Sequence, residues 1–450
     1  MCYWLCGTSG PEVRRLQTKR SLVFLLLGVL VVVAFAGCSS EKKVNASGHS
    51  SAIATTWFDG LYGLVRMEKL SPPEASRIFA YTGVALYESV VPGMPGNQSL
   101  AGQLNGLPEI PQPKSGEAYH WPTIADASIA AVLDGLFAGA APSTKEELAR
   151  LKIDNGRMFA GTVDEAVAQR SRRQGEAVGE AILKWADGDG FRLFNACPYK
   201  VPGGIGFWVP TPPGNIASPL QPCWGKMRTF ALSSGSEFTS PAPGAYSTDP
   251  NSAMYKQALE VVDATKNLTP EQRKIALYWA DDPGATGTPP GHSVAIATQL
   301  LREKNMALDV AAVAYAKVGM AVADGFISSW NTKYVYNLLR PVTYIRQNID
   351  PNWTPLISTP PFPEYTSGHS VQSGAAAEVL VSVFGDGPFT DKTHVNRGLE
   401  ARRFSKLSQY ADEAAVSRLY GGIHYRPAIE IGVEEGRKIG KKINALKWTK

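Results

Sequence analysis

The sequence has few charged residues, few cysteines and no block of like charge. Charged residues make up 19% of the 450 positions, and the formal net charge of +5 is spread along the chain. No run of five or more like charges occurs, so we predict no nucleic-acid partner. After Cys38 no segment reaches about 18 uninterrupted apolar residues, which predicts a body without membrane spans. The hydrophobic fraction of 44% is ordinary for a globular protein.

One long hydrophobic run is present, near the N-terminus. Basic residues up to Arg20 precede SLVFLLLGVLVVVAFAGC, which is typical of an export signal, and Phe35–Cys38 resembles a bacterial lipoprotein cleavage box. We predict a signal segment over 1–38, a lipid on Cys38 and a polar tether over 39–50. The chain would then be an exported cell-envelope lipoprotein, held to the periplasmic or extracytoplasmic face of a membrane by its lipid. An uncleaved anchor is the alternative, since the run is about long enough to span a bilayer.

Five cysteines occur in the chain. Cys2 and Cys6 precede the predicted cleavage site, and Cys38 would carry the lipid. Cys197 and Cys223 remain, both in a segment rich in proline and glycine. In an oxidising compartment we predict a disulfide between them, with two free thiols as the alternative. Their spacing indicates no metal site.

Apolar residues recur at helical spacing over much of the remaining chain. Predicted helices include Pro73–Val91 and Thr144–Gly161, the second with Ser143 or Thr144 as its N-cap. Residues 187–250 are instead dense in Pro, Gly, Ser and aromatic residues. A loop of this length in a compact domain is usually functional or a covering lid, and a surface insertion without a role is the alternative.

Helical spacing resumes at Thr269 and continues to about Leu446. We find no internal repeat and no interdomain linker. The sequence therefore predicts one all-α domain over 51–450, a helical bundle with a long irregular Pro/Gly-rich insertion.

The first of three short segments with chemical potential is KYVYNLLRP. Lys333 and Arg340 are seven residues apart, which on a continuous helix places both side chains on one face. Pro341 disfavours helical geometry at the residue before it, so we expect Arg340 near a helix end. Two cations on one face could clamp an anion, with the planar guanidinium as a fork of donors. A solvated helix face is the alternative.

The second segment is TSGHS, which precedes an apolar run of helical spacing. At a helix N-terminus the free N–H groups and the helix dipole favour an anion. Gly368 would let its amide approach a ligand closely, and Ser367 adds a hydroxyl donor. His369 would lie beside the anion, where its protonated form is favoured. Alternatively, Ser367 or Thr366 is a simple cap and His369 a surface residue.

The third segment is SRLYGGIH. Arg418 and His424 are six residues apart, which does not align them on one straight helix. Gly421 and Gly422 predict a break that lets the two side chains converge. Arg418 would be a third cation, and His424 a candidate nucleophile or ligand, unless it is an unrelated histidine at a helix end. Together the three segments predict an oxyanion pocket.

In this order, Lys-x6-Arg-Pro, Ser-Gly-His and Ser-Arg-x5-His resemble the signature of the type 2 phosphatidic acid phosphatase and vanadium-dependent haloperoxidase superfamily. Thr366 stands where the family usually has proline. From about residue 50 onward, and especially at YWADDPG and PPGHS, the chain is similar to the soluble bacterial haloperoxidase-like branch. The resemblance implies the helical bundle of that superfamily, with a motif core over about 330–446.

The resemblance also implies a role for each matched residue. His369 would be the acid/base catalyst. His424 would bind covalently to vanadium, or attack phosphorus to give a phosphohistidine. Trp330 and Phe362 stand where haloperoxidases place pocket residues near vanadate. Five residues would hold the oxygens of vanadate or phosphate: Lys333, Arg340, Ser367, Gly368 and Arg418.

One position departs from the pattern. The family often has an aspartate four residues after the final histidine, and this chain has Ala428 there. Such an aspartate orients the histidine, as a carboxylate does in a catalytic triad. Another carboxylate could replace it, and the sequence offers three: Glu430, Asp281 and Asp282.

Vanadate and phosphate share shape and charge, so the resemblance implies two reactions. With vanadate as cofactor, a haloperoxidase would oxidise halide with hydrogen peroxide. Without a cofactor, a phosphatase would hydrolyse phosphomonoesters through a phosphohistidine at His424. The length of the chain and its lack of several membrane spans favour the first. A lipoprotein that binds an oxyanion without turnover is a further alternative, motivated by Ala428.

Overall fold

The computed structural model describes residues 44–194 and 197–450. The predicted signal segment over 1–38, including Cys38, lies outside the described residues. A short 3-10 turn, η1 (Ala46–Gly48), falls within the predicted tether, and its first residue is fully buried. Residues 43–450 form one compact unit.

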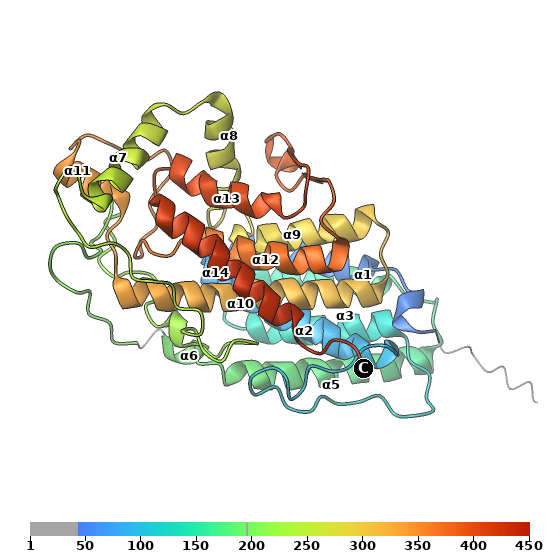
Figure 1. Cartoon of the computed structure of the whole chain (residues 1–450). Helices are drawn as coiled ribbons and strands as arrows, with labels where there is room; N and C mark the ends of the chain where they lie inside the picture. The colour runs from blue at the N-terminus through green and yellow to red at the C-terminus, as the bar shows by residue number, and fades with distance from the viewer. Residues whose placement is uncertain (1–43, 195–196) are drawn as a thin grey trace, which may run out of the picture. The chain divides into compact units, whose positions relative to one another are not determined.

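Helices make up most of the described chain (Figure 1), which confirms the predicted all-α class. The first half contains α1 (Ala52–Glu68), α2 (Pro72–Val90), η2 (Val91–Gly93), α3 (Trp121–Leu136), α4 (Pro142–Arg157), α5 (Glu165–Asp187) and α6 (Phe191–Phe194). The second half contains η3 (Trp224–Lys226), α7 (Ala253–Lys266), α8 (Pro270–Tyr278), α9 (Thr288–Glu303), α10 (Leu308–Tyr336), α11 (Pro341–Asn348), α12 (Gly368–Phe384), η4 (Val395–Arg397), α13 (Gln409–Tyr420) and α14 (Arg426–Asn444). Two short strands, β1 (Phe389–Asp391) and β2 (Arg402–Phe404), pair in antiparallel fashion.

Helix α10 is the central element of the core and packs against both α2 and α12 (Figure 1). Close approach of α2 depends on small residues, because a Cβ at Gly83 would collide with the Tyr315 backbone and one at Gly319 with the Ala80 backbone. By length and composition α10 is apolar enough to cross a membrane, but 89% of its most apolar stretch is buried within the fold. Its hydrophobicity is therefore accounted for by packing inside the protein.

Local signals mark the starts of α2 and α4. Helix α2 begins at Pro72 with a capping box between Ser71 and Glu74, within one residue of the predicted start. The predicted cap of α4 was wrong, because that helix begins at Pro142 and Thr144 lies inside it. Proline at the first helical position favours this earlier start, since its φ is already helical. The Thr144 hydroxyl instead donates to Glu68 at 2.7 Å.

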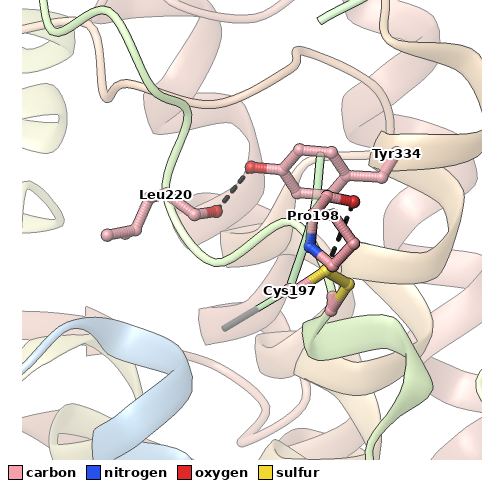
Figure 2. Close-up of a disulfide and its surroundings, with 5 residues drawn as sticks. Cys197, Pro198, Leu220 and Tyr334 are labelled. Carbon is pink, nitrogen blue, oxygen red and sulfur yellow. Dashed lines mark hydrogen bonds between the residues drawn. A yellow bond between two sulfur atoms is a disulfide. The ribbon is translucent and has the colours of Figure 1, made fainter. Parts of the chain in front are cut away.

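The Pro/Gly-rich insertion over 187–250 is irregular, as predicted, with only the short α6 and η3 among its described residues. A disulfide joins Cys197 to Cys223, whose Cα atoms are 6.1 Å apart. Figure 2 shows this disulfide beside Tyr334, whose hydroxyl donates to the carbonyl of Leu220. The insertion therefore forms a hydrogen bond to the last turn of α10, the turn that contains Lys333.

Candidate oxyanion site

Lys333 lies fully buried in the last turn of α10. Its Nζ donates to the carbonyl oxygens of Pro363 at 3.0 Å, Glu364 at 2.9 Å and Thr366 at 2.5 Å. Three acceptors use all three donors of an ammonium group, which fits the charged form of the side chain. Burial, followed by the charge of Arg340, nevertheless lowers the pKa of Lys333 well below its ordinary value.

Lys333 and Arg340 reach the same region from different backbone geometries. Helix α10 ends at Tyr336, because Asn337 adopts a left-handed conformation with φ of 50°. The prediction that the two cations share one helix face was therefore wrong. Arg340 is extended and is the N-cap of α11, as expected for the residue before Pro341.

The Arg340 guanidinium is completely buried and only partly satisfied. Its Nε donates to the Phe362 carbonyl at 2.8 Å and Nη1 to the Ile423 carbonyl at 2.9 Å, while Nη1 also lies 3.1 Å from Nε2 of His424. Nη2 has no partner. Burial lowers the pKa of Arg340 to about 10, so the group stays charged at neutral pH. A buried N–H donor without a partner is a group that a bound anion would satisfy.

Ser367 and Gly368 form the predicted helix N-terminus. Ser367 is the N-cap of α12, and its hydroxyl accepts from the amide of Ser370 at 3.3 Å. Gly368 is the first helical residue, and a Cβ there would come within 3.2 Å of the Trp330 ring and 3.3 Å of Phe326. A glycine therefore avoids close contact with these two rings, and the helix N-terminus predicted for this segment is present.

His369 and Arg418 each bring an unpartnered buried nitrogen to the pocket. Among the described residues, Nε2 of His369 and Nε of Arg418 have no hydrogen-bond partner, while Nη1 of Arg418 donates to the Trp279 carbonyl at 2.5 Å. Burial, then Arg418, lowers the pKa of His369 well below its usual range, and the imidazole is neutral at pH 7. A bound anion acts in the opposite direction and favours the protonated ring.

The turn between α13 and α14 brings His424 to the cations. Helix α13 ends at Tyr420, and Gly422 takes a φ of 77°, which glycine adopts without strain. This is the break predicted from the glycine pair. The pKa of His424 is held well below its usual value, first by burial and then by Arg340 and Lys333, so the ring is neutral.

Glu364 fixes the orientation of His424. Its Oε1 lies 2.8 Å from Nδ1 of His424 and accepts from the amide of Tyr425 at 2.9 Å, and the side chain is fully buried. Burial raises the pKa of Glu364 to about 7. Because Nδ1 carries the proton shared with the carboxylate, Nε2 keeps its lone pair and points toward Arg340. This is the tautomer that a metal ligand or a nucleophile requires.

Glu364 is the residue that sequence reasoning missed. Ala428 is buried, and its carbonyl accepts from the Ser367 amide at 3.0 Å. The proposed replacements for the missing aspartate do not contact His424 within the described chain: Glu430, Asp281 and Asp282. The available signal was an acidic residue three positions before Ser367, on a loop rather than on the helix after His424.

A second buried network lies beside this pocket. Nδ1 of His292 is 2.8 Å from Asp281 and Nε2 is 2.7 Å from Asp391, while Nε2 of His394 is 3.0 Å from Asp281. Burial opposes protonation of His292, but the two carboxylates outweigh it and raise its pKa to about 10. Asp281, His292 and His394 offer ligand atoms close enough together to hold a metal ion, within 4.8 Å of one another. In this structure those atoms form hydrogen bonds to one another. Asp281 comes two residues after the carbonyl that binds Arg418, so the network supports that wall of the pocket.

Comparisons with known proteins agree with this fold. The protein-family model described as "VCPO second helical-bundle domain" matches residues 313–447. The crystal structure of a bacterial vanadium-dependent iodoperoxidase matches with a TM-score of 0.83 and 38% identity, over 88% of this chain and 96% of that chain. A holo-type bacterial vanadium-dependent chloroperoxidase shares the fold, with a TM-score of 0.65 and 16% identity over 84% of this chain and 93% of that one.

The chain therefore belongs to the vanadium-dependent haloperoxidase family, as the sequence motifs predicted. Among individual relatives it is similar to the vanadium chloroperoxidase of Curvularia inaequalis, with 25% identity over 297 residues. That alignment covers 48% of each protein, so it spans about half the length of this curated relative.

The family implies vanadate, and the residues present fit it. Among the described residues, Arg340, Arg418 and His369 each have a buried nitrogen without a hydrogen-bond partner, and the unprotonated Nε2 of His424 lies 3.1 Å from Nη1 of Arg340. Cationic and N–H donors suit the oxygens of a tetrahedral oxyanion. A neutral imidazole whose other nitrogen is held by a carboxylate suits the metal.

Proposed function

We propose that the protein is a vanadium-dependent haloperoxidase that oxidises halide with hydrogen peroxide. The observation that carries the proposal is the neutral His424, oriented by Glu364 and surrounded by three buried cations. The relatives described as an iodoperoxidase and chloroperoxidases support the same activity. Peroxide and halide are the proposed small-molecule substrates, and vanadate is the proposed cofactor.

When bound, vanadate supplies a Lewis-acidic centre that activates peroxide. The protein's own groups hold and orient it. Nε2 of His424 is the proposed vanadium ligand, and the Ser367 hydroxyl with the Gly368 amide donates to its oxygens at the helix N-terminus. Three preorganised cations stabilise negative charge in a site that excludes water: Lys333, Arg340 and Arg418. Nε2 of His369, which is neutral and partnerless, accepts the proton that peroxide loses and later returns it.

Phosphomonoester hydrolysis is the second candidate, favoured by the same histidine–carboxylate pair. A neutral imidazole with Nδ1 held by Glu364 is also an activated nucleophile, and its Nε2 could attack phosphorus while His369 protonates the leaving oxygen. The alternative of binding without turnover rested on Ala428. Because Glu364 supplies the carboxylate that Ala428 lacks, that reason no longer applies.

Reconstitution with orthovanadate tests the proposal. The loaded protein is expected to brominate a phenolic dye in the presence of peroxide, and His424→Ala is expected to abolish this activity because the vanadium ligand is gone. His49→Ala, at a histidine remote in sequence from the motifs, is the matched control and is expected to keep full activity. Hydrolysis of p-nitrophenyl phosphate by a preparation that fails to brominate would replace the haloperoxidase with the phosphatase. Failure of both reactions would leave a binding protein.

We also propose that the protein is exported as a lipoprotein anchored through Cys38. The signal-like sequence before Cys38 supports this proposal, and so does the Cys197–Cys223 disulfide, since disulfides persist in oxidising compartments. Mass spectrometry of protein purified from membranes is expected to show a chain that begins at acylated Cys38. Cys38→Ala should release the protein from the membrane fraction. An intact N-terminus at Met1 would contradict the proposal.

A further inference from the structure

The three pocket cations are balanced by carboxylates that do not touch them. Within the described chain, Lys333, Arg340 and Arg418 form no salt bridge, and their satisfied donors go to backbone carbonyls or to His424. A direct ion pair would occupy the donors that an oxyanion needs. Counter-charge placed one residue further away offsets the cost of burying positive charge, and it leaves Nη2 of Arg340 and Nε of Arg418 without a partner among the described residues.

Glu435 is the least expected of these carboxylates. It lies on α14, outside all three sequence motifs, and is 2% exposed. Its Oε1 accepts from the Ser328 hydroxyl at 2.7 Å, and its Oε2 accepts from the hydroxyls of Ser240 at 2.7 Å and Thr366 at 3.1 Å. Burial raises the pKa of Glu435, while the three hydroxyl donors and the charge of Lys333 act in the opposite direction and favour the ionised form.

Thr366 connects Glu435 to Lys333. Its hydroxyl donates to Glu435, and its carbonyl accepts from Nζ of Lys333. Burial and the charge of Arg340 lower the pKa of Lys333, and the charges of Glu364 and then Glu435 act in the opposite direction and favour the protonated ammonium. Proline, which the superfamily pattern usually has at this position, carries no hydroxyl. The contact with Glu435 therefore depends on a residue in which this chain departs from the pattern.

We propose that Glu435 is the buried counter-charge of Lys333 and, with Thr366, a positioning residue of the oxyanion site. Glu435 favours the charged form of Lys333, whose three donors stay on backbone carbonyls, so that Lys333 acts on the anion through its charge. The assignment rests on the proposed oxyanion site, but it is the same for vanadate and for phosphate. It predicts a defect in anion affinity that is separate from the chemical step.

The test measures binding of orthovanadate to the metal-free protein by isothermal titration calorimetry, without turnover. Glu435→Gln is nearly isosteric and removes the charge. It is expected to raise the dissociation constant for orthovanadate about tenfold, because the charged form of Lys333 is then less favoured. Glu434→Gln, on the exposed side of the same helix, is the matched control and is expected to bind like the unsubstituted protein. Thr366→Val, which keeps the carbonyl and removes the hydroxyl, should show a smaller loss in the same direction.

The Lys333→Arg substitution distinguishes an electrostatic role of Glu435 from a structural one. Arg stays charged at all accessible pH values, so Glu435→Gln added to Lys333→Arg should change the affinity by less than about twofold. A tenfold loss that persists in the Lys333→Arg background would overturn the assignment in favour of packing. Unchanged or tighter binding by Glu435→Gln alone would overturn it as well. No binding by the unsubstituted protein would reject the oxyanion site itself, and this assignment with it.

Discussion

Glutamine in place of Glu364 is expected to lower turnover by about 10²-fold while the protein stays folded. The carboxylate now accepts the Nδ1 proton of His424 and leaves the Nε2 lone pair available. A neutral carboxamide accepts the Nδ1 proton more weakly than a carboxylate does, which gives more weight to the tautomer protonated at Nε2. That tautomer neither binds a metal nor attacks phosphorus, and losses of this origin reach about 10⁴-fold in the serine protease triad.

The orthovanadate affinity provides a second readout for Glu364→Gln. Partners that orient a ligating histidine typically contribute about 10- to 100-fold to metal affinity, so the dissociation constant should rise within that range. Glu430→Gln is the matched control, because Glu430 is an exposed acid close to the position of the missing aspartate and pairs with Arg426 rather than with His424. Activity in Glu364→Gln that equals that of the control would show that Glu364 does not set the tautomer.

Leucine in place of His292 is expected to lower the free energy of unfolding by roughly 3–5 kcal/mol. It leaves Asp281 and Asp391 buried without the cation that bridges them, and an uncompensated buried charge costs about this much. Chemical denaturation at pH 7 measures the loss. His49→Leu is the control, since His49 has no carboxylate partner in the described part of the chain. A loss below about 1 kcal/mol would show that the network contributes little.

The same histidine predicts how stability depends on pH. The pKa of His292 is raised from 6.5 to about 10 in the folded protein. Its contribution is therefore fully present below pH 6.5 and is lost as the pH rises through about 10. Denaturation curves between pH 6.5 and 10 should show falling stability for the unsubstituted protein and a flatter profile for His292→Leu. Equal slopes for the two proteins would mean that His292 does not titrate in this window.

The parts of the site that could be predicted from the sequence are those with local causes. The N-terminus of α12 follows from Ser367 as cap and Gly368 as first helical residue, and the turn before His424 follows from its glycine pair. A cap or a glycine acts on neighbours within one turn of chain, so its signal is read directly. The Lys333–Arg340 geometry was missed because Asn337, a residue that tolerates the left-handed conformation, ends the helix between them.

Glu364 and Glu435 could not be predicted, because their partners lie far away in the sequence. Glu364 meets a histidine 60 residues later, and Glu435 meets a threonine 69 residues earlier and a serine 195 residues earlier. Each pairing exists only after the helices have packed, and no short-range pattern marks an acid that will be buried. A family pattern that expects an acid after His424 directed attention to the wrong part of the chain.

The insertion over 187–250 has a consequence for protein engineering. It is fastened to α10 at Leu220, and its Ser240 supplies one of the hydroxyls on Glu435. The hydroxyl of Tyr365, the residue before Thr366, also donates to the carbonyl of Pro241 at 2.8 Å. Exchanging this insertion with that of a relative would therefore also replace residues that contact Glu435 and Tyr365. A shortened or grafted segment would have to supply a hydroxyl at the position of Ser240 and a carbonyl at the position of Pro241 to keep these contacts.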